Sequence, residues 1–229
     1  MKVLVLVLLL LPVSLLAVGQ SRLDLGLKKE LDSIYAVDQK WRVLLFDPRV
    51  SRKPDSIAAA LGVRKDELFA YISRRMVQTD SSNQVRMRAI LKQYGYPGKS
   101  LVGTPTNEAA WSVIQHSQDI GTYLPLIKTA AKRGELPFYW YGQMLDRQLM
   151  REGKEQVYGT QAMGYSITTP ATGKREGQPP FMWPIKDAAK VNELRKSSGF
   201  LTTVEQVAAS LGISYSVLTL KDVAQMPKE

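Results

Sequence analysis

The stretch that decides the fold is residues 23–46, LDLGLKKELDSIYAVDQKWRVLLF. Its apolar side chains recur at three- and four-residue steps, at Leu27, Leu31, Ile34, Trp41 and Leu45. This spacing places them on one face of an α-helix. Asp47-Pro48 ends the pattern, because a residue that precedes proline is disfavoured in helical backbone. We therefore expect a long amphipathic helix that needs partner helices to cover its apolar face.

The rest of the chain repeats the helical pattern. It predicts helices over residues 56–77, 83–94, 107–117, 123–133 and 135–152, and two more after Asp187 and after Thr202. The first of these has an interruption near Gly62, and Asn107 is the expected N-cap of the third. Thr202 and Glu205 suggest a capping box for the last. Residues 98–105 are expected to form a loop. Residues 156–184 differ, with two short strands at 165–168 and 181–183 around a loop rich in Gly and Pro. The prediction is a mainly α fold with a minor α+β character: one helical domain, residues 20–229, with a short two-stranded insertion.

Residues 1–19 are typical of a secretory signal peptide, with Lys2 before an apolar run and small residues at Ala17 and Gly19. A retained membrane anchor is the alternative, but the run is shorter than the roughly 20 residues that span a bilayer. We therefore expect cleavage before Gln20, an exported (periplasmic or extracellular) protein, and no stable membrane span after cleavage.

The composition limits the chemistry that the protein can perform. The chain has one histidine and no cysteine, which excludes a cysteine nucleophile, a two-histidine zinc site and any disulfide partner. It contains no Gly-x-Ser-x-Gly elbow, phosphate-binding loop or dinucleotide fingerprint. A divalent metal held by carboxylates and the one imidazole stays open, but no spacing motif supports it. No metal-binding residue is assigned, and the cofactor is left unknown.

The chain is basic, with a formal net charge of +10. This charge suits an anionic or envelope-derived ligand, and solubility alone explains it as well. Residues 203–214 look like the first half of a helix-turn-helix, but an exported protein would not meet DNA. We therefore expect no nucleic-acid partner.

Two carboxylates fall on apolar helix faces, where an unpaired charge is costly. Asp38 lies on the apolar face of the first helix, with Arg42 one turn away, which predicts a partly buried ion pair that either staples helices together or belongs to a site. Asp146 lies in an apolar sector with Gly142, beside Arg147. Asp146 is either a pocket carboxylate or a core aspartate with all its hydrogen bonds made, and Gly142 permits the close approach of a ligand or of another segment.

The single histidine, His116, falls with Gln115 and Asp119 on the polar face of its predicted helix. Asp119 could orient the imidazole ring as in an acid–base pair. A solvent-exposed helix face is the alternative, unless a second layer covers that helix. Tyr158 and Gln161 follow at a Gly-containing turn, where loops often line polar pockets, although ordinary turn chemistry explains them too.

These landmarks, in this order, resemble an uncharacterised bacterial family of unknown function. They are Asp38-Gln39-Lys40-Trp41-Arg42, Asp80 with Asn83, Tyr94-Gly95-Tyr96-Pro97, Gln115-His116-Ser117-Gln118-Asp119, Asp146-Arg147, Tyr158-Gly159-Thr160-Gln161 and Pro184-Ile185-Lys186-Asp187. The resemblance implies kinship without a mechanism. Its polar landmarks suggest that Asp38, Arg42, His116, Asp119, Asp146, Arg147 and Gln161 converge on one cleft.

Two functions follow from these residues. The first is an exported acid–base enzyme, hydrolase-like, in which Asp146, Asp38, His116 and Asp119 are catalytic, and Arg42, Arg147, Gln115, Tyr158 and Gln161 bind an anionic or envelope-derived ligand. The second is a non-catalytic ligand-binding or envelope-interaction domain that uses the same residues. The sequence slightly favours the enzyme.

Overall fold

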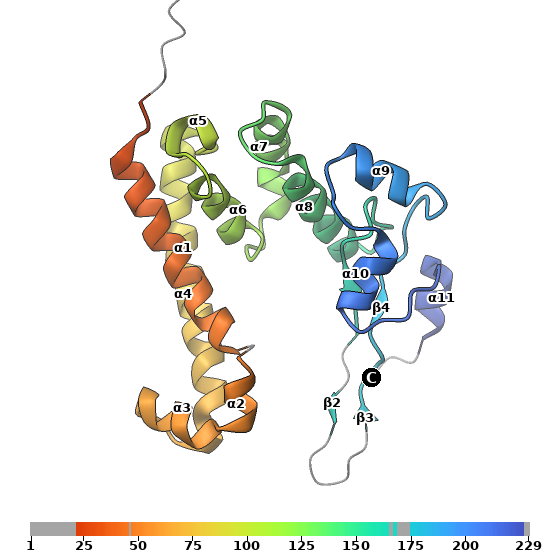
Figure 1. Cartoon of the computed structure of the whole chain (residues 1–229), viewed down its shortest axis with the longest axis horizontal. Helices are drawn as coiled ribbons and strands as arrows, with labels where there is room; N and C mark the ends of the chain where they lie inside the picture. Colours follow the sequence, from red (N-terminus) through yellow and green to blue (C-terminus); the bar gives the residue numbers. More distant parts are fainter. Residues whose placement is uncertain (1–21, 46, 165–166, 169–174, 227–229) are drawn as a thin grey trace, which may run out of the picture.

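The structure is a computed structural model that describes residues 22–45, 47–164, 167–168 and 175–226 (Figure 1). The predicted signal peptide, residues 1–19, lies outside the described residues. None of the helices within the described ranges is long and apolar enough to cross a membrane.

A pair of antiparallel helices, α1 (Leu25–Leu45) and α4 (Leu68–Tyr94), forms one side of the molecule (Figure 1). Helix α1 buries the apolar stripe that its sequence predicts and ends before Asp47-Pro48. The prediction for residues 23–46 is therefore confirmed, with ends that differ by one or two residues.

The connection between the two long helices is itself helical. It contains α2 (Pro48–Arg52), α3 (Pro54–Leu61) and a 3₁₀ turn, η1 (Lys65–Glu67). Gly62 ends α3 in the left-handed conformation, with φ 67°, which confirms the interruption predicted there. The predicted break between residues 77 and 83 is wrong, because α4 runs through it as one helix of 27 residues. Its polar residues Asp80 and Asn83 bond to α1, and these tertiary contacts override their weak helix propensity.

A second group of helices, α6 to α8, joins the long pair to the C-terminal part (Figure 1). It follows the single turn α5 (Lys99–Val102) and the 3₁₀ turn η2 (Thr106–Glu108), and consists of α6 (Ala109–Ile114), α7 (Ile120–Lys132) and α8 (Phe138–Arg151). The predicted helix over residues 107–117 is too long, and Asn107 is not its N-cap. The Asn107 side chain instead donates to the Glu135 carbonyl at 2.8 Å.

The C-terminal part contains the predicted β-structure, but with a different pairing. Strand β1 (Ala162–Met163) pairs antiparallel with β4 (Phe181–Met182), and β2 (Ile167–Thr168) pairs with β3 (Arg175–Glu176). The strand predicted at 165–168 therefore pairs with 175–176 and not with 181–183, and residues 165–166 lie outside the described ranges. The fold is mainly α with minor β, as predicted.

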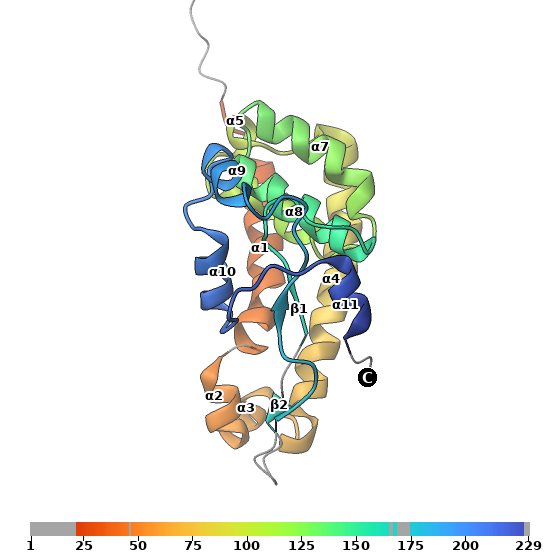
Figure 2. The same ribbon diagram turned by 90° about the vertical axis from the view of Figure 1, so that its right-hand side faces the viewer.

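Three short helices follow the strands: α9 (Val191–Ser197), α10 (Val204–Ser210) and α11 (Leu220–Gln225). Figure 2 shows them around the strands, in front of α8. The capping box of α10 uses Thr203 and Gln206, one residue later than predicted. Thr202 is occupied elsewhere, because Arg195 binds it. Residues 211–219 separate α10 from α11, which is far longer than the short turn of a helix-turn-helix.

The apolar core is divided into three clusters. The largest lies among α1, α4, α6, α7 and α8; a second, around Trp41 and Ile72, lies at the other end of the α1–α4 pair; the third, around Met182 and Val204, holds the C-terminal part together. On α1, Asp38 lies between Ile34 of the first cluster and Trp41 of the second. A buried polar layer therefore separates two apolar layers of the same helix pair.

Candidate functional site

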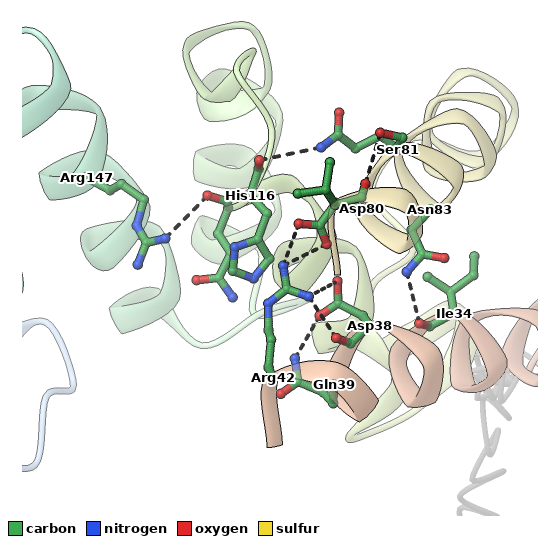
Figure 3. A network of polar contacts seen from close by, with 12 residues as sticks. Ile34, Asp38, Gln39, Arg42, Asp80, Ser81, Asn83, His116 and Arg147 are labelled. Carbon is green, nitrogen blue, oxygen red and sulfur yellow. Dashed lines mark hydrogen bonds and ion pairs between the residues drawn. The ribbon is translucent and has the colours of Figure 1, made fainter. Parts of the chain in front are cut away.

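Arg42 links two carboxylates between α1 and α4 (Figure 3). Its Nη2 donates to both carboxylate oxygens of Asp80, at 2.7 and 2.8 Å, and its Nη1 donates to the Asp38 carbonyl at 2.7 Å. The Asp38 carboxylate lies 3.3 Å from the same Nη1. The predicted Asp38–Arg42 ion pair is confirmed. Asp80, part of the family-like pattern, was not predicted as a site residue.

Asp38 is the most deeply buried member of this layer, with 1% of its surface exposed. Burial raises the pKa of its carboxyl to about 6, while the Arg42 charge and a hydrogen bond from Gln39 oppose that shift. Its Oδ1 accepts no hydrogen bond among the described residues, although Arg42 is near. Asp38 is thus a carboxyl that titrates close to neutrality but does not itself face solvent.

His116 lies in a turn, residues 115–117, that directly follows α6. Each of the three backbone carbonyls accepts a bond from another helix. Arg151 Nη1 donates to the Ser117 carbonyl at 2.8 Å, and longer contacts join Arg147 Nη1 to Gln115 (3.4 Å) and Gln84 Nε2 to His116 (3.5 Å). Side chains from α4 and α8 therefore cap the C-terminal end of α6, where cations are favourable.

The His116 ring is half-buried beside the arginines rather than on a solvent-exposed helix face (Figure 3). Its Nε2 is buried and has no hydrogen-bond partner in the described part of the chain. Burial, together with the charges of Arg42, Arg147 and Arg151, lowers the pKa of the imidazole to about 3. The placement expected from the sequence is wrong because α6 ends before His116, so its helical wheel does not apply.

Asp119 does not orient the ring. It is exposed, its backbone N–H donates to Ser117 Oγ at 3.2 Å, and it lies at a shallow depression of about 240 Å³ that Gln84, Ser117 and Tyr123 also line. No contact joins its carboxylate to His116 among the described residues. The expected His116–Asp119 pair is absent from this part of the structure.

Asp146 belongs to a separate network on another side of α8. It is fully buried, and its carboxylate accepts from the backbone N–H groups of Val157, Tyr158 and Thr160 and from Thr160 Oγ1, at 2.7 to 3.1 Å. Burial raises the pKa of Asp146, and these hydrogen bonds oppose that shift. Asp146 is a core aspartate whose oxygens are occupied, one of the two alternatives that the sequence left open.

Gln156 and Arg195 complete this second network. The Gln156 amide accepts from the N–H groups of Thr160 and Gln161 at 2.8 Å and donates to the Gln161 and Trp183 carbonyls. Arg195, 1% exposed, donates to the carbonyls of Tyr158 and Thr202 at 2.6 and 2.7 Å. Neither residue is among the predicted site residues. On α9, the one signal for the burial of Arg195 is its position one turn after the apolar Val191.

Gly142 allows two aromatic side chains beside this network to pack closely against α8. A Cβ there would lie 2.9 Å from Phe200 Cζ and 3.0 Å from Tyr158 Cδ2. The Phe200 ring stacks on Tyr158 and lies under the Arg195 guanidinium, 4.6 Å from its Cζ. The close approach that Gly142 permits is therefore to a protein side chain.

The predicted site residues thus divide into two groups and do not share one cleft. Asp38, Arg42, Gln115, His116 and Arg147 lie around the turn after α6, together with Asp80, Gln84 and Arg151; we name these eight residues the His116 cluster. Asp146, Tyr158 and Gln161 lie in the network around Gln156 and Arg195, and Asp119 lies in neither. Asp146 and Arg147, neighbours in sequence, point to different networks. Among the described residues, no three His, Asp or Glu side chains are placed to hold a metal ion.

The protein is mainly helical, and its described part contains a saturated polar network around Asp146 and the His116 cluster, in which buried atoms of Asp38 and His116 lack hydrogen-bond partners. Comparison with protein families shows that the chain belongs to a family of unknown function, DUF6624, which matches residues 58–215. The expected kinship with an uncharacterised family is confirmed. Helix α1, with Asp38 and Arg42, precedes the matched residues. No curated protein and no solved structure matches the chain.

The role of Asp146 predicts a large effect on stability. We expect Asp146→Asn to destabilise the fold by on the order of 3 kcal/mol, because the amide presents two donors to N–H groups that now reach a carboxylate. Urea unfolding measures this change. Asp119→Asn is the matched control and should change stability by less than about 0.5 kcal/mol. Equal stability of the two variants would contradict the assignment.

The pKa shifts of Asp38 and His116 act on stability in opposite directions. The protonated form of Asp38 is favoured in the folded chain. Its contribution to the free energy of unfolding is therefore present below pH 3.8 and is lost as the pH rises through about 6. The neutral form of His116 is favoured in the folded chain. Its contribution to the free energy of unfolding is therefore present above pH 6.5 and is lost as the pH falls towards about 3.

A second prediction uses the fact that the chain has one histidine. The NMR signal of the His116 ring should not titrate between about pH 5 and about pH 8, because burial and three arginines keep the imidazole neutral. A chain without a histidine tag gives an unambiguous signal. A short histidine peptide in the same tube should titrate near pH 6.5. A His116 midpoint near that of the peptide would contradict the buried, arginine-flanked placement.

Proposed function

We propose that the protein binds an anionic ligand at the His116 cluster. The observation that carries this proposal is the buried Nε2 of His116, which has no hydrogen-bond partner among the described residues although the charges of Arg42, Arg147 and Arg151 act on the ring. Buried polar atoms are nearly always hydrogen-bonded, and an exception calls for an explanation. A neutral imidazole has one ring nitrogen that donates and one that accepts, so it can bond to an oxyanion or its conjugate acid without adding charge.

The arginines supply the charge for such a ligand. Arg147 is largely buried and makes one long contact, to the Gln115 carbonyl at 3.4 Å, although a guanidinium carries five N–H donors. Burial and the charge of the nearby Arg151 lower the pKa of Arg147. In the described part of the chain, no carboxylate lies within ion-pair distance of Arg147 or Arg151. An anion at this position would relieve the repulsion between the two arginines.

The acid–base, hydrolase-like enzyme is the second candidate. The pKa of Asp38, near 6, favours it, because a general acid is most effective when its pKa is close to the working pH. Against it, Asp38 is buried beneath Arg42, the oxygens of Asp146 are occupied, and Asp119 lies apart. The geometry therefore supports ligand binding better than catalysis by the four candidates Asp146, Asp38, His116 and Asp119.

Export is part of the proposal and rests on residues 1–19 alone. We expect the mature chain to begin at Gln20, since small residues occupy the positions that signal peptidase reads. N-terminal sequencing of the protein recovered from outside the cytoplasm checks this. A recovered chain that still begins at Met1 would exclude cleavage.

The binding proposal is tested with inorganic phosphate as the probe. We expect phosphate to shift the single histidine NMR signal at constant ionic strength, and Arg147→Gln to weaken this binding at least about tenfold, because a charge-assisted hydrogen bond is lost. Arg133→Gln, an exposed arginine at the end of α7, is the matched control and should bind phosphate as the native chain does.

The same titration separates the two candidates. If Arg147→Gln and Arg133→Gln bind phosphate equally, or if phosphate leaves the His116 signal unmoved, the binding proposal fails. Asp38→Asn should retain phosphate binding, because the groups proposed to contact the anion are His116, Arg147 and Arg151, and Asp38 is bonded to Arg42 instead. An enzyme would show more: turnover of an envelope-type glycan or ester that disappears in Asp38→Asn while phosphate binding is retained.

A further inference from the structure

A second hollow lies along α8, and its lining residue Gln143 precedes Arg147 of the His116 cluster by one helical turn. It has a volume of about 280 Å³, is open to solvent, and is lined by Tyr139 and Gln143 of α8 and by residues 199–202, which include Phe200, Leu201 and Thr202. Ligand sites commonly have volumes of this order and combine aromatic walls with a few polar groups. None of the lining residues is charged, so this hollow suits a neutral part of a ligand.

Its position follows from the helix. Tyr139, Gln143 and Arg147 are spaced by four residues on α8, so they form one ridge of the helix surface. At 1.5 Å per residue, Tyr139 and Arg147 lie about 12 Å apart along the helix axis. Gln143 at the hollow is therefore one turn of α8 from Arg147 at the edge of the His116 cluster.

The side chains of the hollow suit a sugar ring. The ring of Tyr139 leans against Phe200, with centroids 6.1 Å apart, and Phe200 is fixed in turn by Tyr158 and Arg195. An aromatic wall of this kind packs on apolar C–H faces, and the Gln143 amide offers a donor and an acceptor for hydroxyl groups. The Thr202 hydroxyl accepts from Arg195 and keeps its own hydrogen to donate. Leu201 is 98% exposed at the rim, where no described residue covers it.

We propose that the ligand is an anionic oligosaccharide, with a sugar ring against Tyr139 and Leu201 and an acidic group at Arg147 and His116. This inference rests on the proposed anion site and adds the class of ligand. An acidic saccharide matches both the uncharged hollow at Tyr139 and the positive charge of Arg147, since it has ring faces, hydroxyl groups and negative charge within one short chain. The basic character of the protein, with net charge +10, favours the same class.

The test uses trigalacturonate, a chain of three acidic sugars, with maltotriose as the neutral probe of equal length. We expect trigalacturonate to bind more tightly than maltotriose and to shift the His116 NMR signal. Tyr139→Ala should weaken trigalacturonate binding about five- to tenfold, and Tyr139→Phe should retain it, because the ring and not the hydroxyl makes the contact. Tyr94→Ala, at the end of α4, is the matched control.

A second variant avoids any effect on folding. Leu201→Glu changes an exposed side chain and places a negative charge at the rim, so it should weaken trigalacturonate binding several-fold and leave the melting temperature unchanged. Leu25→Glu, 71% exposed at the start of α1, is its control and should not affect binding. Isothermal titration calorimetry at fixed ionic strength measures all of these affinities.

The outcomes separate this inference from the anion site itself. If Arg147→Gln weakens phosphate binding but Tyr139→Ala and Leu201→Glu leave trigalacturonate binding unchanged, the anion site stands and the saccharide inference is overturned. If trigalacturonate does not bind, or binds no better than maltotriose, the inference is also overturned. If Arg147→Gln leaves the binding of both phosphate and trigalacturonate intact, the anion site fails, and the inference fails with it.

Discussion

The contact between Arg42 and the carboxylates of Asp38 and Asp80 is the constraint on which the helical part of the structure depends. It lies inside the α1–α4 pair, between an apolar layer around Ile34 and another around Trp41. Burying these charges is costly, and the cost is offset only when the three side chains meet with good geometry. Sliding α4 by one turn against α1 would keep much of the apolar contact but would separate Arg42 from Asp80. The polar layer therefore selects one register for the two helices.

That register determines where the turn after α6 lies. Gln84 follows Asp80 by one turn on α4, and its amide reaches the His116 carbonyl at 3.5 Å. From the opposite side, Arg147 and Arg151 of α8 reach the carbonyls of Gln115 and Ser117. The turn is held between two helices that are distant in sequence. This explains why a short helix such as α6 can place one side chain, His116, at a fixed position beside Arg42.

The sequence predicted the fold class, the long first helix and the burial of Asp38 and Asp146, because helical periodicity carries that information directly. It did not predict the continuity of α4, since residues 78–82 have weak helix propensity and their helical state depends on a bond to α1. Asp80 was overlooked as a site residue for the same reason: its core position appears only when α4 is read as one helix. The wheel for His116 failed because α6 ends at Ile114, and helix ends are the least predictable part of a helix.

The two carboxylates that intrude on apolar faces have different consequences, and the difference lies in their partners. Asp146 is surrounded by donors from a loop, so its charge is solvated by the protein itself and no capacity is left for a ligand. Asp38 shares Arg42 with Asp80. The same Arg42 charge acts on His116, whose Nε2 has no hydrogen-bond partner within the described ranges. A buried carboxylate on a helix face therefore marks a polar network, but only the count of satisfied atoms indicates whether that network is complete. Among the described residues, Asp38 and His116 each keep a buried polar atom without a hydrogen-bond partner, whereas Asp146 does not, so the His116 cluster is the site that we propose for a ligand.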